Sequence, residues 1–259
     1  MTAATPGRLD LSPAPGAAPA VRRVLAYAVH ELRQQLRNGE QLLLTLVIPV
    51  GALVLLANVP ILPLGPRPVD TVTPGVLALA VMSTAFTGQA IATGFERRYG
   101  ALKLLGATPL GRTGLLVGKT LAVVAIELGQ VALLCLVAVA LGWRPQGDPG
   151  SVAVLLLLGT AAFSGLGLLL AGTLRAEATL AAANLVYVVL LAVGGVLLPV
   201  RVFPDRVAAV LHALPSTALA EGLRDVLEHG TGFPVLAAAV LAAWALVTLV
   251  AAARTFRWE

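Results

Sequence analysis

Residues 149–174 read PGSVAVLLLLGTAAFSGLGLLLAGTL, and no charged side chain occurs between Asp148 and Arg175. A membrane-spanning helix needs about 20 mostly apolar residues, so this stretch predicts one span. The whole chain is 58% hydrophobic and only 12% charged, whereas soluble domains carry about 25% charged residues. Applied to the whole chain, the same criterion predicts an all-α membrane protein with six transmembrane helices. They lie near residues 41–58, 74–95, 120–143, 152–174, 178–198 and 234–253.

The segment before the first span divides into a tail and a helix. Residues 1–20 are rich in Pro, Ala and Gly and lack the apolar core of a signal peptide, which predicts a flexible cytoplasmic tail. Residues 21–259 then form the transmembrane domain. In residues 21–38, apolar residues recur at helical spacing and basic residues occupy other faces, which favours a helix lying in the membrane interface. A soluble helix or an early start of the first span are the alternatives. The basic residues are Arg22, Arg23, Arg33 and Arg37.

The distribution of Lys and Arg between the two sides of the membrane predicts the orientation of the spans. With six spans, 13 of the 18 basic residues lie on the side of both termini and 5 on the other side. Cytoplasmic loops carry the excess of Lys and Arg. The chain is therefore predicted to cross the plasma membrane several times with both termini in the cytoplasm. This asymmetry accounts for the net charge of +5 without a nucleic-acid partner.

The loop between the second and third spans has its own pattern. Residues 95–120 read FERRYGALKLLGATPLGRTGLLVGKT. An apolar stripe at three-residue spacing follows a charged start, before Gly106 and Pro109 end the helix. Such a short amphipathic helix fits a groove on a partner protein, or else anchors the loop to anionic lipid head groups. The residues concerned are Glu96, Arg97, Arg98 and Lys103 for the charges, and Tyr99, Leu102 and Leu105 for the stripe.

Between the fifth and sixth spans, helix-breaking prolines precede two short amphipathic segments, at residues 207–214 and 218–227. The sequence allows these segments to be re-entrant helices, which are tolerated where protein surrounds them. A helical hairpin on the surface is the alternative. The breaks are at Leu198, Pro199 and Pro204.

One acidic residue, Glu127, falls inside a predicted span. A carboxylate at that depth is costly and usually faces protein or water. Gln130 lies three residues later on the same helix face. The pair is predicted to line a transport path or a subunit interface, unless Glu127 is shallow enough to reach the head groups.

Enzyme motifs are weak in this sequence. Gly118-Lys119-Thr120 resembles the end of a P-loop, but the glycine required five places earlier is Thr113. Lys119 is instead predicted to be a cytoplasmic anchor at the start of the third span. The three histidines are scattered, and neither a catalytic nor a metal site is predicted. An ion-coupled secondary transporter is a less favoured alternative, because only Glu127 is an ionisable group inside a span.

Three motifs, which follow one another along the chain, resemble the motifs of a known protein family. They are an E-R-x-x-G-x-L-x-x-L pattern, a T-P-L-x-R element and a P-x-T-x-x-x-E-G-L-R element before the last span. Together they resemble ABC-2 type transporter permeases, which include antibiotic and multidrug efflux permeases, over nearly the whole chain after the tail. The matching residues are Glu96, Arg97, Gly100, Leu102 and Leu105; Thr108, Pro109, Leu110 and Arg112; and Pro215, Thr217, Glu221, Gly222, Leu223 and Arg224.

The resemblance implies a permease subunit of an ATP-driven exporter rather than an enzyme. A separate ABC ATPase would bind ATP and Mg, and this chain would bind no cofactor. Residues 96–105 would be a cytoplasmic coupling helix seated on that ATPase, with the helix at 21–38 as a second contact. The outer segments would form a lid containing Pro199, Pro204, Pro215, Glu221 and Arg224.

Six spans are too few to enclose a wide path, so a second permease copy, identical or different, is expected to pair with the first. The predicted cargo is a lipophilic or amphipathic compound, such as a drug, an antibiotic or a lipid-like metabolite. A polysaccharide or glycolipid exporter of the same family is the nearest alternative, although aromatic residues make up only 5% of the chain. The composition, rich in Ala and Arg, suggests a bacterium of high GC content.

Overall fold

The computed structural model describes residues 16–59, 67–197 and 199–256, and over these ranges all the regular secondary structure is helical. The expected tail therefore falls largely outside the described residues, as does Leu198. The helices are α1 (Ala20–Arg37), α2 (Gly39–Asn58), α3 (Pro68–Val81), η1 (Met82–Gly88), α4 (Gln89–Arg98), α5 (Ala101–Gly106), α6 (Gly111–Ala140), α7 (Pro149–Thr173), α8 (Ala176–Val193), η2 (Val200–Val202), α9 (Asp205–Leu211), α10 (Pro215–Leu227) and α11 (Val235–Thr255).

Five helical segments among the described residues are long and apolar enough to cross a membrane: Pro68–Arg98, Gly111–Ala140, Pro149–Thr173, Ala176–Val193 and Val235–Thr255. The first of these is continuous through α3, the π-helical turn η1 and α4. The remaining expected span, 41–58, lies in α2, whose apolar part Thr45–Asn58 is shorter. The all-helical membrane architecture is confirmed, and the sixth span stays a prediction.

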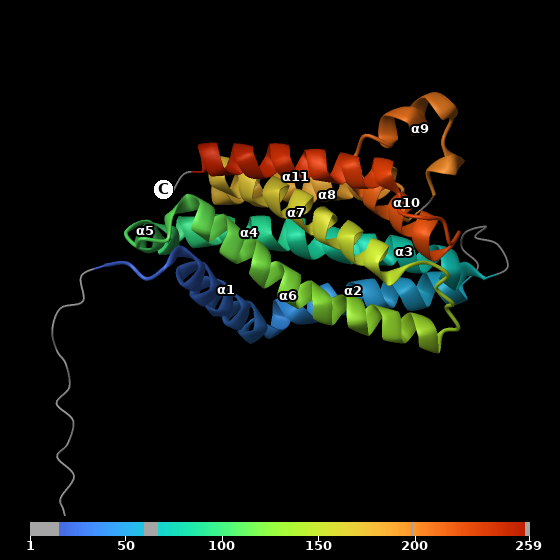
Figure 1. Ribbon diagram of the computed structural model, residues 1–259, viewed down its shortest axis with the longest axis horizontal. Coiled ribbons are helices and arrows are strands. Elements are labelled where there is room, and N and C mark those ends of the chain that lie inside the picture. The colour runs from blue at the N-terminus through green and yellow to red at the C-terminus, as the bar shows by residue number, and fades with distance from the viewer. Residues whose placement is uncertain (1–15, 60–66, 198, 257–259) are drawn as a thin grey trace, which may run out of the picture.

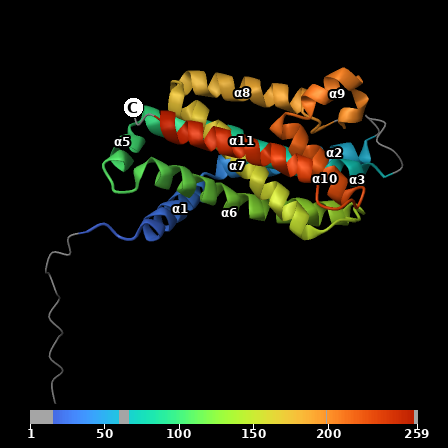
Figure 2. The ribbon, with the colours of Figure 1, turned by 45° about the horizontal axis from the view of Figure 1, so that its top comes forward.

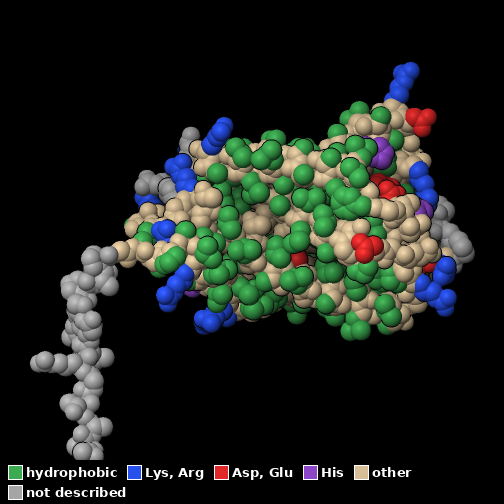
Figure 3. Space-filling model, in the orientation of Figure 1, with side chains coloured by type: hydrophobic (Ala, Val, Ile, Leu, Met, Phe, Trp, Pro, Cys, Tyr) green, Lys and Arg blue, Asp and Glu red, His purple; other side chains and the backbone are tan. Residues whose placement is uncertain are grey.

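The long helices run side by side along the longest axis of the molecule (Figures 1 and 2). The segment Pro68–Arg98 is the most buried of the five and lies at the centre, packed on α2, α7, α8 and α10. The most exposed are α8 and α11. Apolar side chains cover the flank of the molecule in Figure 3, and Lys and Arg gather towards its two ends, as a chain surrounded by lipid requires.

Small residues allow the closest helix contacts. A Cβ at Gly165 of α7 would lie 2.2 Å from the hydroxyl of Thr248 on α11, and one at Gly167 would lie 2.7 Å from the backbone oxygen of Phe86. Both glycines therefore permit close approach of the helices. Gly194 and Gly195 follow the end of α8 at Val193. Gly195 has φ +69° and turns the chain after the helix.

One end of the bundle holds α1, α5 and the last turn of α11 (Figure 1). We call it the terminal end. The opposite end holds α9 and α10. Of these two, α10 packs on α3, α7 and α11, whereas α9 stands away from the bundle.

Candidate functional site

The short helix expected after the second span is α5, at the terminal end. Gly100 has φ +76°, a left-handed conformation that lets the chain turn sharply between α4 and α5. The side chains of the predicted apolar stripe point in two different directions, some into the protein and some outward. Leu102 is fully buried and Leu105 is half-buried, but Tyr99 is 77% exposed, as is Leu104 at 76%. Tyr99 and Leu104 therefore form the outward apolar surface of this turn.

The two arginines at the end of α4 reach the connection between α7 and α8. Arg97 donates a hydrogen bond to the backbone oxygen of Leu174, and Arg98 forms an ion pair with Glu177. The predicted contact of these side chains with a partner stays a prediction, and within the chain they tie α4 to its neighbours. Lys103 is exposed on α5.

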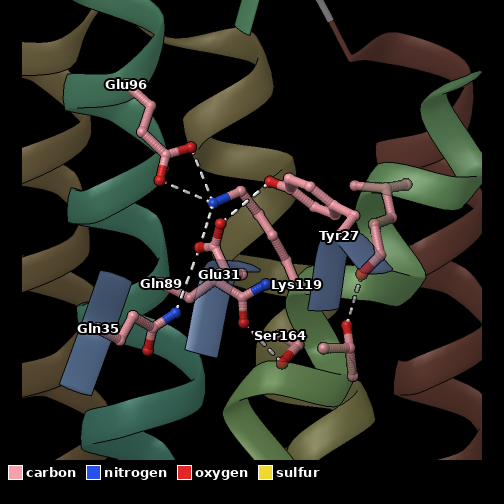
Figure 4. Close-up of polar contacts among 9 residues, drawn as sticks. Tyr27, Glu31, Gln35, Gln89, Glu96, Lys119 and Ser164 are labelled. Carbon is pink, nitrogen blue, oxygen red and sulfur yellow. Dashed lines mark hydrogen bonds and ion pairs between the residues drawn. The ribbon is translucent and has the colours of Figure 1, made fainter. Parts of the chain in front are cut away.

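A buried ion cluster lies beneath α5, centred on Lys119 of α6 (Figure 4). Its ammonium nitrogen lies 2.6 Å from Oε1 of Glu31 on α1 and 2.8 Å from Oε2 of Glu96 on α4. The Lys119 side chain is 1% exposed, and those of Glu31 and Glu96 are 5% and 16% exposed. One cation thus holds three helices together through two carboxylates.

Polar neighbours complete the hydrogen bonding of Glu31. The Tyr27 hydroxyl donates to Oε2 at 3.1 Å, and the amide of Gln35 donates to Oε1 at 3.2 Å. Burial alone would raise the pKa of Glu31, but the attraction of Lys119 and these hydrogen bonds outweigh it, so that the pKa lies below its usual value. Burial raises the pKa of Tyr27. Glu31 is therefore held as a carboxylate.

The position of Lys119 corrects the sequence-based expectation of a surface anchor. Helix α6 begins at Gly111, not near residue 120, so Lys119 lies two turns inside it. A buried ammonium group needs a partner of opposite charge, and α1 and α4 supply two. Glu96 likewise points inward to Lys119 rather than outward with α5.

Helix α1 turns the face that carries Tyr27 and Glu31 towards the bundle. Tyr27, Ala28 and Glu31 are buried, whereas Val21, Leu25 and Leu36 of the predicted apolar stripe are 70%, 52% and 53% exposed. This apolar side faces away from the bundle, which suits contact with lipid. Of the four arginines predicted to lie on the interfacial helix, Arg23 donates a hydrogen bond to the backbone oxygen of Pro109. The other three are exposed: Arg22, Arg33 and Arg37.

The predicted pair Glu127 and Gln130 lies in the interior of the bundle. Glu127 accepts a hydrogen bond from Thr160 of α7, and its other carboxyl oxygen has no partner among the described residues. Gln130 donates to the backbone oxygen of Thr45 on α2 at 2.6 Å and accepts from Thr84 at 3.0 Å. The pair therefore links α6 to its neighbours.

At the opposite end, the P-x-T-x-x-x-E-G-L-R element forms a clamp. Arg224 of α10 is 2% exposed. It donates to the backbone oxygens of Gly195 and Val196, the latter at 2.9 Å, and to Glu221 at 2.7 Å. Glu221 also accepts from the backbone N–H of Val200 at 3.1 Å.

The prolines of the predicted lid lie at the starts of helices. Pro215 is at the first turn of α10, while Pro199 and Pro204 immediately precede η2 and α9. Proline is favoured there because its fixed φ suits the first turn and its missing N–H is not needed.

A cavity of about 590 Å³ adjoins the ion cluster at the terminal end. It lies between α1, the start of α2, η1 and α4. Glu31 and Glu96 form its acidic wall, and Ile91, Phe95 and Tyr99 contribute apolar and aromatic surface. No Lys or Arg is among its described lining residues.

The model of a family described as ABC-2 type transporter matches residues 22–227, from the first turn of α1 to the end of α10. The matched region contains the ion cluster, α5 and the Arg224 clamp. No curated protein matches the chain.

Proposed function

The chain belongs to the ABC-2 type transporter family and is a multi-pass transmembrane subunit of an ABC transporter, and we propose that it exports a lipophilic or amphipathic compound from the cell. The observation that most supports this cargo is the cavity at the terminal end, which combines apolar, aromatic and acidic surface beside a lipid-facing helix. Mostly apolar pockets of this size with a few polar groups suit drug-sized ligands.

Members of this family associate with ABC ATPase partners, and we propose α5 as the coupling helix. Its support is the outward apolar pair Tyr99 and Leu104, whose side chains are largely exposed. ATP and Mg²⁺ would bind to the partner. Closure of two ATPases would move α5, and the inward ties of Glu96, Arg97 and Arg98 would transmit that motion to α1, α6 and the α7–α8 connection.

The motion would shift the bundle between inward-open and outward-open arrangements, since packed elements switch between discrete states. A second permease copy would complete the path, and α9 with the turn before it would cover the outer face. Both termini would then be cytoplasmic, with α2 as the sixth span.

Reconstitution tests the proposed export directly. In vesicles that contain the permease and its partner ATPase, a fluorescent amphiphile should cross the membrane in an ATP-dependent manner. A catalytically inactive ATPase should abolish that transport. Movement that persists with the inactive ATPase and follows an ion gradient would instead favour a secondary transporter.

The coupling surface can be tested by changing its exposed residues. We expect Tyr99→Ser with Leu104→Ser to weaken binding of the ATPase roughly tenfold or more, because exposed aromatic and apolar anchors carry much of an interface's energy. Stability should change little, since both side chains are more than 70% exposed. Co-purification and ATPase stimulation provide the measurements. Val210→Ser, a similarly exposed position on α9, is the control, and equal binding by all variants would refute the assignment of α5.

The orientation can be tested by cysteine labelling, because Cys135 is the only cysteine. In a Cys135→Ala background, Val210→Cys should react with a membrane-impermeant maleimide in intact cells, whereas Leu104→Cys should react only after lysis. Both positions are exposed in the structure, so burial does not limit labelling. The reverse pattern would place the termini outside the cell.

A further inference from the structure

The ion cluster holds more acidic than basic groups. Lys119 supplies one ammonium group, whereas Glu31 and Glu96 supply two carboxyl groups. Glu31 also accepts hydrogen bonds from Tyr27 and Gln35, whereas Glu96 accepts from Lys119 alone among the described residues. An uncompensated charge in a partly buried site is costly, so the site favours a further cation.

The acidic groups face the cavity. Both carboxylates line it, whereas Lys119 lies behind them and is not a lining residue. The described lining residues include no basic side chain that could neutralise the wall from the other side. A ligand in the cavity would therefore meet a net negative surface.

The remaining walls suit an amphiphilic body. The rings of Phe95 and Tyr99 stack with centroids 6.2 Å apart, and Ile91 and Ala92 continue the apolar surface along α4. Aromatic faces attract cations as well as apolar groups. A volume of about 590 Å³ can hold a molecule with several rings.

We infer that this cavity is a binding site for a cationic amphiphile, with Glu96 as its charge-recognising residue. The inference rests on the proposed export function and specifies the substrate class. The ligand's cationic head lies against Glu96 and Glu31, and its apolar body lies along Ile91, Phe95 and Tyr99. Helix α1, which forms one wall of the cavity, also exposes apolar side chains that suit the lipid interface, where amphiphiles concentrate.

Binding can be measured with the full chain in nanodiscs of zwitterionic lipid. The probe is tetraphenylphosphonium, a bulky aromatic monocation, and triphenylphosphine oxide is its uncharged comparison. Equilibrium dialysis against empty nanodiscs corrects for partition into lipid. We expect saturable binding of the cation, at least tenfold tighter than that of the neutral compound.

Glu96→Gln should weaken binding of the cation at least tenfold, because charge at contact distance in a partly buried site is strongly felt. The variant should remain folded, since it leaves Lys119 and Glu31 as a neutral pair. Glu177→Gln, an exposed acid at the same end but outside the cavity, should bind as the wild type does. Ala92→Phe, which fills the apolar part of the cavity without changing charge, should also weaken binding.

The outcomes separate this inference from the proposed function. Equal affinity for the cation and the neutral compound, or unchanged affinity in Glu96→Gln, would overturn the inference. If the wild type failed to bind the cation while its complex still exported an uncharged amphiphile, the inference would fail and the export function would stand. Absence of any ATP-driven transport by the complex would reject the function itself.

Discussion

Lys119→Met should destabilise the protein by about 3–5 kcal/mol, the usual cost of removing one partner from a buried ion pair. The change leaves Glu31 and Glu96 without their cation in a site where Lys119 is 1% exposed. Because these carboxylates come from α1 and α4, we expect α1 to separate from the bundle first. Thermal unfolding in detergent measures the stability, and protease cleavage within residues 20–37 reports on α1.

Rescue variants distinguish the ion cluster from simple loss of packing. The combination Lys119→Met, Glu31→Met and Glu96→Met replaces all three charged groups by apolar side chains of similar size, a change that is often neutral or stabilising for a complete buried cluster. It should therefore recover most of the lost stability. Lys103→Met, at an exposed position on α5, should have little effect. A Lys119→Met protein as stable as the wild type would show that the cluster does not hold α1.

The same cluster shows why the spans were predictable and the site was not. Runs without charge identify membrane helices because each span must bury about 20 apolar residues whatever its neighbours are. Lys119 pairs with residues 88 and 23 positions away in the sequence. Helical periodicity along one segment cannot show which distant carboxylate faces a given residue. The predicted start of the third span near residue 120 also placed Lys119 outside the helix that buries it.

The loop after the second span shows a related limit. Its charges and apolar residues are consistent with a surface helix, and α5 is present. However, the pattern does not tell which face is covered by the rest of the chain. The structure turns Glu96 and Leu102 inward and leaves Tyr99 and Leu104 outside. A sign that could have been noticed is Lys119 itself, which directly precedes the predicted third span and would need an acidic partner if the helix began earlier.

The element at residues 215–224 was expected to be part of an outer lid because of the family resemblance. In the structure, those residues bind the chain itself. Arg224 is fully enclosed, and a Cβ at Gly75 of α3 would lie 2.8 Å from its Nη2. Burial of this arginine depends on backbone oxygens that become available only where α8 ends, at Gly195 and Val196. Sequence spacing gives no information on such acceptors.

Arg224→Met should therefore destabilise the opposite end of the bundle by about 3–5 kcal/mol, because it leaves Glu221 and two buried backbone oxygens without their donor. The segment from Gly195 to Val200 should loosen first, since Arg224 and Glu221 bind both of its ends. Thermal unfolding and protease cleavage between residues 195 and 214 measure these effects. We also expect ATP-driven export to fall, because α9 follows directly from that segment.

Matched variants define what the clamp requires. Arg224→Lys should recover only part of the stability, because an ammonium group cannot reproduce the fork of a guanidinium that reaches several acceptors. Arg206→Met, at an exposed position on α9, should change the stability little. The assignment fails if Arg224→Met unfolds at the wild-type temperature, or if Arg206→Met is destabilised as much as Arg224→Met. In either case, the loop after α8 would be held by apolar packing, and the Arg224 side chain would not contribute to its stability.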